Sequence, residues 1–254
     1  MGVLQDKVAI VTGATSGIGQ AAARLFAAED ARLVVNGRNT AKLHELVAQI
    51  GEERAVALAG DVRDPAVAEG LVDKARQCFG GLDIAFNNAG IVGDMGPVTA
   101  LGMDAWREVL DVNLTSAYLA AHHQVPAMLE RGGGSLIFTS SFVGYTAGLP
   151  GMSAYAAAKA GLIGFAKALA GELGAQGIRV NALLPGGTDT PMNIAKKPGA
   201  DPGLQDFVNR LHALKRMAHP EEIARGALFL ASEASSFVTG TALLVDGGVS
   251  ICRS

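Results

Sequence analysis

The sequence predicts an α/β protein with a doubly wound parallel sheet of seven strands and helices on both of its faces. Short apolar runs rich in β-branched residues alternate with longer amphipathic segments along the whole chain. Polar residues or glycines follow most of the apolar runs, as expected where parallel strands end at a ligand site. With 254 residues, of which 49% are hydrophobic, the chain is long enough to bury one large core. We therefore expect a single domain over residues 1–254.

The apolar runs give the seven expected strands, at residues 7–13, 31–39, 55–62, 82–90, 133–141, 177–185 and 240–248. The helical segments lie between them, at residues 14–29, 41–50, 65–80, 103–132, 153–173, 204–214 and 220–232. Pro65 begins the third helix, since proline is favoured at the first position of a helix. Strands and helices that alternate in this way predict βαβ units and hence a parallel sheet.

A glycine-rich turn, GATSGIG over residues 13–19, joins the first strand to the first helix. Gly13, Gly17 and Gly19 let the backbone approach a pyrophosphate, and the helix N-terminus after them offers unpaired N–H groups and partial positive charge. Glycine turns also connect strands to helices in proteins that bind no dinucleotide. The pattern is therefore informative mainly because a second strand follows at the distance typical of dinucleotide-binding folds. The turn predicts a dinucleotide site.

The tip of the second strand bears on which dinucleotide binds. Asn36, Gly37 and Arg38 stand there, with no carboxylate to accept a hydrogen bond from a ribose 2'-hydroxyl. The Arg38 guanidinium can instead hold a 2'-phosphate, which favours NADP(H) and leaves NAD(H) as the second choice. In such folds a second basic residue in the glycine loop often strengthens this preference. That position is Ser16 in this chain, which carries no positive charge. A solvated arginine on a loop is the alternative.

Tyr155 and Lys159 lie four positions apart in the helix expected over residues 153–173, so their side chains point the same way, along an apolar stripe that includes Leu162 and Ala166. An ammonium within about 4 Å of a phenol favours the phenolate by up to roughly 4 kcal/mol at an effective dielectric constant near 20. We therefore expect Lys159 to lower the pKa of Tyr155 toward neutrality, which suits a general acid for a carbonyl oxygen or a base for an alcohol. Alternatively, the lysine extends past its apolar neighbours to water.

Two further segments carry expectations. Residues 103–132 form one long expected helix with Asn113 in its middle, either facing solvent or placed to bond a partner, and with Pro126 bending it. Residues from about 188 to 215 contain Pro191, Pro198 and Pro202, and we expect a mobile substrate flap with one short helix. An insertion without function is the alternative for the flap.

The bulk properties argue against several classes of partner. A net charge of -3 without any basic cluster argues against nucleic acid. Cys78 and Cys252 are too far apart for a redox or zinc pair, and no other grouping has metal-ligand spacing, so we expect no metal. The N-terminus lacks the pattern of a signal peptide and no run is long enough to span a membrane, which predicts a cytoplasmic protein.

Several motifs in this order and at these distances resemble the classical short-chain dehydrogenase/reductase family: TGATSGIG, GDV, NNAG, VNL, SFVG, Tyr155 with Lys159, VNALLPGGTDTPM and VDGG. The resemblance covers residues 7–248 and implies a Rossmann-like fold. It implies that Tyr155 is the general acid/base, that Lys159 lowers the tyrosine's pKa and bonds the nicotinamide ribose, and that Asn113 holds a water for proton relay. Ser141 matches the serine that holds the substrate oxygen, with Ser140 as the neighbour to test beside it.

The resemblance also implies the cofactor-binding residues, which are Gly13, Ser16, Gly17, Ile18, Gly19, Arg38, Asp61, Val62, Asn88, Ala89, Gly90, Tyr155, Lys159, Pro185, Gly186, Thr188 and Thr190. The spacing from Ser141 to Tyr155 is one residue longer than the commonest family spacing, which puts in doubt the shape of the intervening loop and of the substrate pocket. No motif marks the pocket residues themselves, which we place at 92–95, 142–152 and the flap.

The function implied is an oxidoreductase (EC 1.1.1.-) that transfers a hydride between NADP(H) and a carbonyl or secondary alcohol. The alternatives are a non-catalytic dinucleotide-binding sensor, for which a broken catalytic set would be expected, and a lyase or epimerase on the same fold. The resemblance suggests a homotetramer. Small residues give the helix of Tyr155 an outer side that suits close approach of another helix: Ala156, Ala157, Ala158, Ala160, Gly161 and Gly164.

Overall fold

The computed structural model describes residues 1–193 and 203–252. Within them, seven strands form one parallel sheet in the order β3-β2-β1-β4-β5-β6-β7. The strands are β1 (Val8–Val11), β2 (Arg32–Gly37), β3 (Ala55–Ala59), β4 (Ile84–Asn87), β5 (Gly134–Thr139), β6 (Ile178–Pro185) and β7 (Ala242–Val245). The doubly wound sheet expected from the sequence is confirmed.

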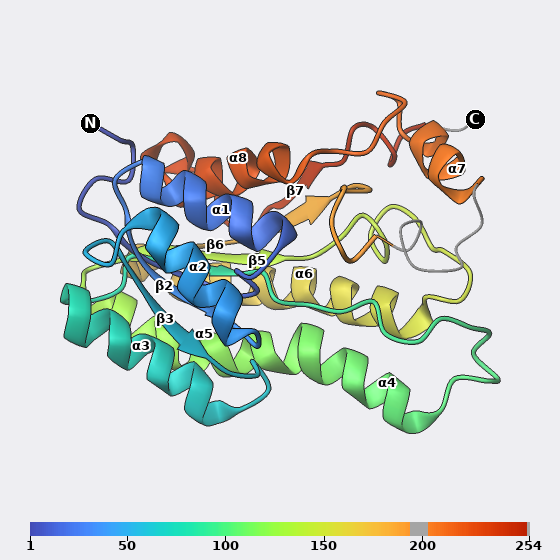
Figure 1. Ribbon diagram of the computed structural model, residues 1–254. Coiled ribbons are helices and arrows are strands. Elements are labelled where there is room, and N and C mark those ends of the chain that lie inside the picture. The colour runs from blue at the N-terminus through green and yellow to red at the C-terminus, as the bar shows by residue number, and fades with distance from the viewer. Residues whose placement is uncertain (194–202, 253–254) are drawn as a thin grey trace.

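Helices cover both faces of the sheet (Figure 1). One face carries α1 (Gly17–Ala28), α2 (Thr40–Ile50) and α8 (Pro220–Ala231), and the other carries α3 (Pro65–Phe79), α5 (Ser116–Glu130) and α6 (Ser153–Leu173). The remaining helical segments are α4 (Met103–Leu110), a π-helical turn (Asp111–Thr115), α7 (Leu204–Leu211) and two 3-10 turns (Gly174–Gln176 and Glu233–Ser235). Each face thus has its own apolar core layer against the sheet.

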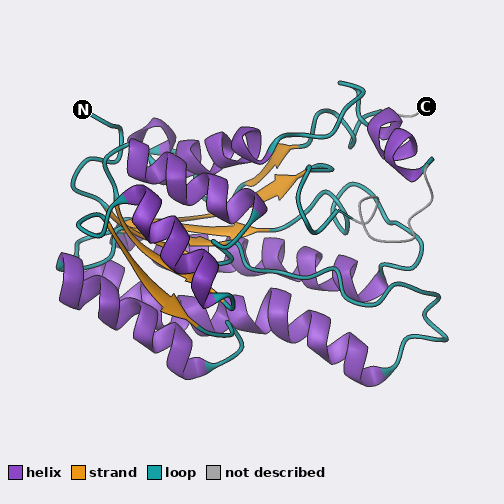
Figure 2. Cartoon of the chain, viewed as in Figure 1, coloured by secondary structure: helices purple, strands orange, loops and turns teal. Residues whose placement is uncertain are grey.

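The chain reverses its direction across the sheet between β1 and β4. It runs outward from β1 through β2 to β3, and then returns to the other side of β1 at β4. The carboxyl ends of β1 and β4 therefore diverge into a crevice, which is the usual ligand site of an open parallel sheet. Figure 2 shows the strands opening out toward the end of the molecule that carries the long loops and α7.

The prediction of one long helix over residues 103–132 is wrong in one respect. It is divided into α4 and α5 by the π-helical turn, and Asn113 lies in that turn. Helix α5 contains Pro126 in its interior and continues to Glu130. A π-helical turn inserts one residue into the helix and is frequently found at functional sites.

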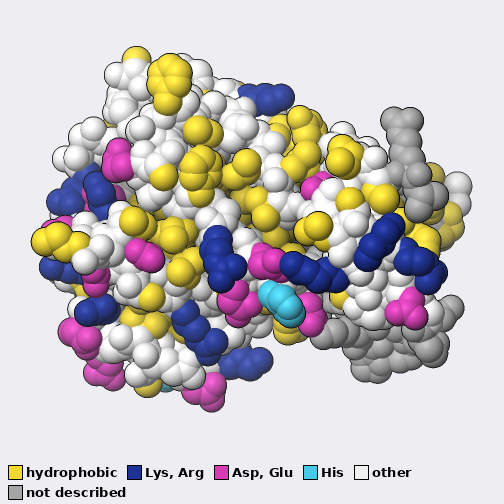
Figure 3. All heavy atoms as spheres, turned by 90° about the horizontal axis from the view of Figure 1, so that it is seen from above, with side chains coloured by type: hydrophobic (Ala, Val, Ile, Leu, Met, Phe, Trp, Pro, Cys, Tyr) yellow, Lys and Arg dark blue, Asp and Glu magenta, His cyan; other side chains and the backbone are white. Residues whose placement is uncertain are grey.

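The expected flap falls only partly within the described residues. Its short helix is α7, whereas Pro198 and Pro202 lie outside the described part of the chain. Among the described residues, no helix combines the length and apolarity needed to cross a membrane. On the face seen in Figure 3, basic and acidic side chains are interspersed and no single-sign field forms.

Candidate active site

One cavity of about 390 Å³ lies at the carboxyl ends of the strands. All of the candidate residues except Gly19 line it. They reach it from β1, β2, β3, β4, β5 and β6 and from helices on both faces of the sheet, so that residues from Gly13 to Thr190 meet in one place. Since the site is assembled at strand ends, the order of the strands fixes which motif stands beside which.

The glycine turn forms one wall of the cavity. Gly13 and Gly17 have φ of +67° and +54°, which side chains other than glycine rarely adopt. Gly19 packs against the turn itself, since a Cβ there would stand 2.3 Å from the Gly13 carbonyl oxygen. The Ser16 side chain makes no capping bond to α1. The N-terminus of α1 thus faces the cavity with backbone N–H groups, which is the arrangement that binds a pyrophosphate.

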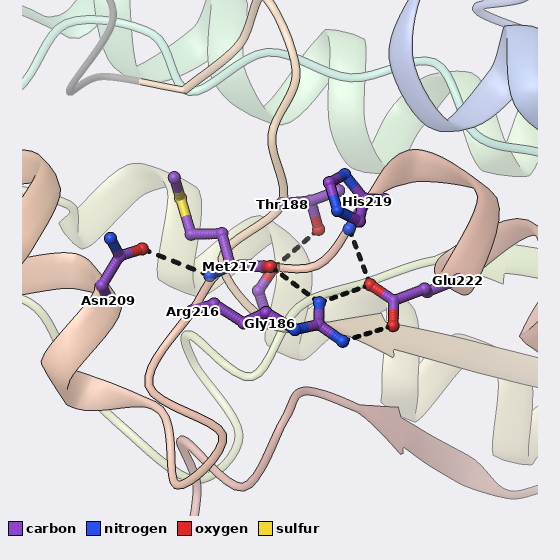
Figure 4. A network of polar contacts seen from close by, with 7 residues as sticks. All are labelled: Gly186, Thr188, Asn209, Arg216, Met217, His219 and Glu222. Atoms are coloured by element: carbon purple, nitrogen blue, oxygen red, sulfur yellow. Dashed lines mark hydrogen bonds and ion pairs between the residues drawn. The ribbon is translucent and has the colours of Figure 1, made fainter.

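The loop after β6 lies against this turn. A Cβ on Gly17 would stand 2.9 Å from Cγ2 of Thr190. Pro185, Gly186 and Thr188 continue along the cavity, and the Thr188 hydroxyl donates to the Gly186 carbonyl at 3.0 Å (Figure 4). The cavity wall therefore passes without a break from the glycine turn to the end of β6.

The far end of the cavity is formed by the tips of β2 and β3. Arg38 is exposed and lines it. A Cβ on Gly37 would stand 2.5 Å from Cγ2 of Thr15, so Thr15 occupies space that an acidic side chain at position 37 would need. Arg63 holds the Asp61 carboxylate at 2.7 and 3.0 Å, and this bidentate bond lowers the pKa of Asp61 to about 2. Arg63 and Thr15 are site residues that sequence reasoning missed.

Backbone amides after β4 are fixed by Thr12. Its hydroxyl accepts from the N–H groups of Asn88 and Ala89 at 3.0 and 3.1 Å, and the Asn88 amide donates to the Thr12 carbonyl at 3.2 Å. Thr139 donates to the Asn88 side chain at 3.2 Å. These bonds join the ends of β1, β4 and β5 and set the floor of the crevice. The role of Thr12 could not be predicted from the sequence, because it depends on β1 and β4 being neighbours in the sheet.

The Asn113 side chain is hydrogen-bonded inside the protein and does not face solvent. It is 2% exposed, and its amide donates to the carbonyls of Ile91 and Val109 at 2.9 and 2.8 Å. Its oxygen accepts from the Ile91 N–H at 3.1 Å. A Cβ on Gly90 would stand 2.6 Å from that oxygen, so glycine is needed for this contact. Asn113 thereby holds the loop after β4 against the π-helical turn.

Ser141, Tyr155 and Lys159 stand together in the cavity. The Ser141 hydroxyl lies close enough to the Tyr155 hydroxyl to lower the pKa of the phenol, and its Oγ accepts from the Val143 N–H at 3.1 Å. The Lys159 amine donates to the Thr139 carbonyl at 2.7 Å and lies 5.6 Å from the centre of the Tyr155 ring. Lysine and tyrosine therefore share one pocket at the end of β5, and the lysine does not extend to bulk water.

Ser140 has a different place. Its hydroxyl donates to the backbone carbonyl of Lys159 at 2.6 Å and is buried. Ser140 thus fastens β5 to α6, while Ser141 presents its hydroxyl to Tyr155.

The expected lowering of the Tyr155 pKa is wrong for this structure. Burial raises the pKa of Tyr155 above its ordinary value, and the hydrogen bond with Ser141 offsets part of that rise. Burial also lowers the pKa of Lys159 to about 7. The ammonium loses the hydration that stabilises its charge, which weakens the electrostatic partner that the sequence argument assumed. The pair therefore holds a protonated phenol beside an amine that titrates near neutral pH.

The rest of the cavity beside Tyr155 is mostly apolar, with Asn193 and His212 as polar exceptions. Its lining comes from the loop after β4, the loop after β5, and the segment around α7: Ile91, Val92, Phe142, Val143, Leu149, Met152, Met192, Val208, Leu211 and Met217. Of the pocket residues expected at 92–95, Val92 lines the cavity, whereas Met95 does not and is 46% exposed. This end of the cavity suits an uncharged, apolar molecule.

No group of three or more His, Cys, Asp and Glu side chains in the described part of the chain is arranged to hold a metal ion. The polar groups of the cavity include glycine-rich backbone, the exposed Arg38 guanidinium, the Tyr155 phenol and the Lys159 amine. These groups fit a dinucleotide, whose anionic pyrophosphate would face the N-terminus of α1.

Comparison with known proteins gives consistent results. The family model described as Enoyl-(Acyl carrier protein) reductase matches residues 13–250. Cyclohexanol dehydrogenase of Acinetobacter sp. (strain SE19) is 38% identical over 95% of this chain and 94% of its own. Cis-4-hydroxycyclohexanecarboxylate dehydrogenase of Sinomonas cyclohexanicum is 39% identical over 96% of each chain. 3beta-hydroxysteroid dehydrogenase 1 of Eggerthella lenta is 38% identical over 98% of this chain and 95% of its own.

The family resemblance of the sequence motifs is thus supported over nearly the whole length by a family match, by full-length relatives and by the parallel sheet with its site at the strand ends. The chain belongs to the short-chain dehydrogenase/reductase family.

Proposed function

We propose that this protein is an oxidoreductase that transfers a hydride between NADP(H) and a carbonyl or secondary alcohol, with Tyr155 as the general acid/base. The observation that carries the proposal is the group of Ser141, Tyr155 and Lys159 between a dinucleotide-shaped cradle and an apolar pocket. The nicotinamide, when bound, supplies or accepts the hydride. The chain's own residues supply the proton and hold the reacting oxygen.

In the direction of reduction, Tyr155 donates its proton to the carbonyl oxygen. The raised pKa keeps this phenol protonated at neutral pH, so the acid is ready before the reaction begins. The Ser141 hydroxyl, which is within hydrogen-bonding reach of Tyr155, holds the same oxygen. Because the pKa of Lys159 is about 7, its amine can lose and regain a proton near neutral pH and so restore the phenol after each turnover.

Asn113 lies where it could hold a water molecule for the proton transfer to Lys159. Both hydrogens of its amide are donated to backbone carbonyls, so a relay water would be held by the remaining lone pair of its oxygen or by its backbone. A second effect is steric, because Asn113 fixes the loop that begins at Gly90.

The preference for NADP(H) over NAD(H) is supported by the tip of β2. Arg38 is exposed at the cavity, and Asp61, the nearby carboxylate, is already neutralised by Arg63. Thr15 occupies the place of an acidic side chain at position 37. A 2'-phosphate at this end would meet a guanidinium and no unpaired carboxylate from these residues.

The substrate class follows from the lining and the relatives. The pocket beside Tyr155 is mostly apolar, and relatives at 38–39% identity are named for dehydrogenation of cyclohexanol and of cis-4-hydroxycyclohexanecarboxylate. We propose a cyclic secondary alcohol, or the corresponding ketone, as the substrate. The chain would act as a single domain in the cytoplasm, with the described parts of the expected flap, residues 188–193 and 203–215, covering the substrate.

A homotetramer is proposed through the outer side of α6. Ala157 and Gly164 are exposed, and a Cβ on Gly164 would meet nothing within 4 Å. Ala158 is fully buried and Gly161 packs against Leu114, so these two do not belong to the outer side as expected. The exposed remainder of the helix is still small enough for close approach by a second copy.

The test is a turnover assay of the purified protein with NADPH and NADH against cyclohexanone, cyclohexanol, a 3-ketosteroid and an acyclic ketone. Turnover of the cyclic compounds with NADPH preferred supports the proposal. Dinucleotide binding without turnover of any carbonyl or alcohol would favour the non-catalytic sensor, and turnover with NADH alone would overturn the proposed nucleotide preference.

A further inference from the structure

His212, at the end of α7, is a buried polar side chain that the proposed mechanism does not use. It is 2% exposed, and its Nε2 accepts a hydrogen bond from the backbone N–H of Gly187 at 2.9 Å. Its Nδ1 lies 2.8 Å from the carbonyl oxygen of Val208. A backbone N–H can only donate, so Nε2 carries no proton, and Nδ1 carries the one that is donated to Val208.

The imidazole ring lies between two glycines from different strand ends. A Cβ on Gly187, after β6, would stand 2.7 Å from Cε1 of His212. A Cβ on Gly247, after β7, would stand 3.4 Å from its Cδ2. The carbonyl of Gly247 also accepts from the Leu214 N–H at 3.1 Å. The end of α7 is therefore fitted closely against the backbone of both loops.

The segment that leaves α7 returns to the same loop. The Ala218 N–H donates to the Gly187 carbonyl, and the Asp189 N–H donates to the Ala218 carbonyl, both at 2.9 Å. The Asn209 side chain accepts from the Met217 N–H at 3.2 Å (Figure 4). The backbone of Gly187 is thus bonded on its N–H side by His212 and on its carbonyl side by Ala218.

The other end of this segment is anchored to α8. Arg216 donates to the Met217 carbonyl at 3.1 Å and forms two bonds with Glu222 at 2.6 and 2.7 Å (Figure 4). Glu222 also accepts from the His219 N–H at 2.8 Å, at the start of α8. With this end fixed to α8, His212 is the side chain that links α7 directly to the Gly187 amide.

Both partners of this link face the cavity. Val208, Leu211 and His212 line it from α7, and Gly187 and its neighbours line it from the end of β6. In the proposed function, the segment that contains α7 covers the apolar substrate. The family resemblance implies in addition that the loop at Gly186–Thr188 receives the nicotinamide end of the dinucleotide. A side chain that bonds one to the other can set the position of both.

We propose that His212 is a positioning residue that holds the Gly187 amide against α7, so that the nicotinamide end of the dinucleotide and the cover of the substrate pocket are seated as one unit. This inference rests on the proposed function, because it requires the nicotinamide end to lie at residues 186–188. The adenosine end, at Arg38 and Asp61, has no contact with this unit among the bonds described.

The test compares two ligands of the protein without substrate. In His212→Phe the ring is kept, but the Gly187 N–H loses its acceptor, and a buried unpaired donor weakens the fold of that loop. The affinity for NADPH should fall about five-fold to a hundred-fold. Adenosine 2',5'-bisphosphate, which reaches only the adenosine end, should bind as it does to the wild type. Both affinities are measured by titration calorimetry.

Two variants serve as controls. His212→Gln keeps an acceptor at the distance of Nε2 and should restore NADPH affinity to within about three-fold of wild type, which a loss of ring packing alone would not allow. His44→Phe makes the same chemical change at an exposed position of α2 and should change neither affinity. If His212→Phe does not fold, His212→Asn replaces it, since its side chain is polar but too short to reach Gly187, and the same selective loss is expected.

The outcomes separate this inference from the proposed function. If the wild type binds neither ligand, the proposed function fails. If the wild type binds both and His212→Phe binds NADPH equally well, or loses both ligands to the same degree, the positioning role of His212 is wrong.

Discussion

Replacing Lys159 with methionine should stabilise the folded protein while removing its activity. Methionine keeps nearly the same volume but carries no charge into the buried site. Burial lowers the pKa of Lys159 from 10.5 to about 7, and at about 1.4 kcal/mol for each pH unit this corresponds to roughly 5 kcal/mol of destabilisation when the amine is charged in both states. The variant also leaves the Thr139 carbonyl without its partner, which costs about 1 to 3 kcal/mol. We expect a net gain of about 2 to 4 kcal/mol at pH 6.

The stability difference between wild type and the Lys159→Met variant should depend on pH. Unfolded lysine stays protonated up to about pH 10.5, whereas folded Lys159 loses its proton above about pH 7. Between these values the unfolded chain binds more protons, so wild-type stability rises with pH, and the burial penalty is fully present only below pH 7. At pH 9 roughly 2 kcal/mol of the penalty remains, and the advantage of the variant should shrink by about 3 kcal/mol.

The assay is urea denaturation of both proteins, without dinucleotide, at pH 6 and pH 9, followed by circular dichroism. Lys159→Gln is a matched control, because it can still donate to the Thr139 carbonyl and carries no charge. A stability difference that does not change between the two pH values would refute the reasoning, as would a methionine variant that is less stable than wild type at pH 6.

Three further predictions concern the nucleotide, the assembly and the two serines. Arg38→Ala should weaken NADPH binding about ten-fold to a hundred-fold and leave NADH nearly unchanged in fluorescence titrations, and equal weakening of both would contradict the nucleotide assignment. Gly164→Glu should dissociate the assembly in sedimentation velocity and lower activity with it; a wild type that is a fully active monomer at micromolar concentration would contradict the tetramer. Ser141→Ala should lower kcat with cofactor affinity unchanged, whereas Ser140→Ala should lower the melting temperature through the lost bond to the Lys159 carbonyl. Turnover of Ser141→Ala at the wild-type rate would remove that serine from the mechanism.

Much of the fold could be predicted from local sequence. The strands are short buried runs between glycines and polar residues, so each of the seven expected strands appears in the sheet, with ends that differ by a few residues. For the same reason the glycine turn and the motifs at strand ends were correctly placed around one cavity, since the ends of parallel strands meet at one edge. The spacing of Tyr155 and Lys159 was enough to put them on the same side of α6.

What sequence reasoning missed depends on contacts between distant segments. Asn113 looked ambiguous because a helical pattern does not show a π-helical turn or the loop that its amide bonds. Thr12 begins the TGATSGIG motif and His212 belongs to no motif, but the roles of both follow from backbone groups that only the folded chain brings to them. The raised pKa of Tyr155 does not follow from the four-residue spacing, because the spacing indicates the attraction of a charged lysine but not the burial of both groups.

The proposed function depends on proton transfer by Tyr155, and Tyr155→Phe removes the hydroxyl that would carry this proton. The variant keeps the ring that lies beside Lys159 and loses only the hydroxyl, which is the group that faces Ser141. With cyclohexanone as substrate, turnover should fall by at least about a hundred-fold, the lower range for loss of a general acid, while the dissociation constant for NADPH stays within a few-fold of wild type. Turnover within a few-fold of wild type would contradict the mechanism proposed here.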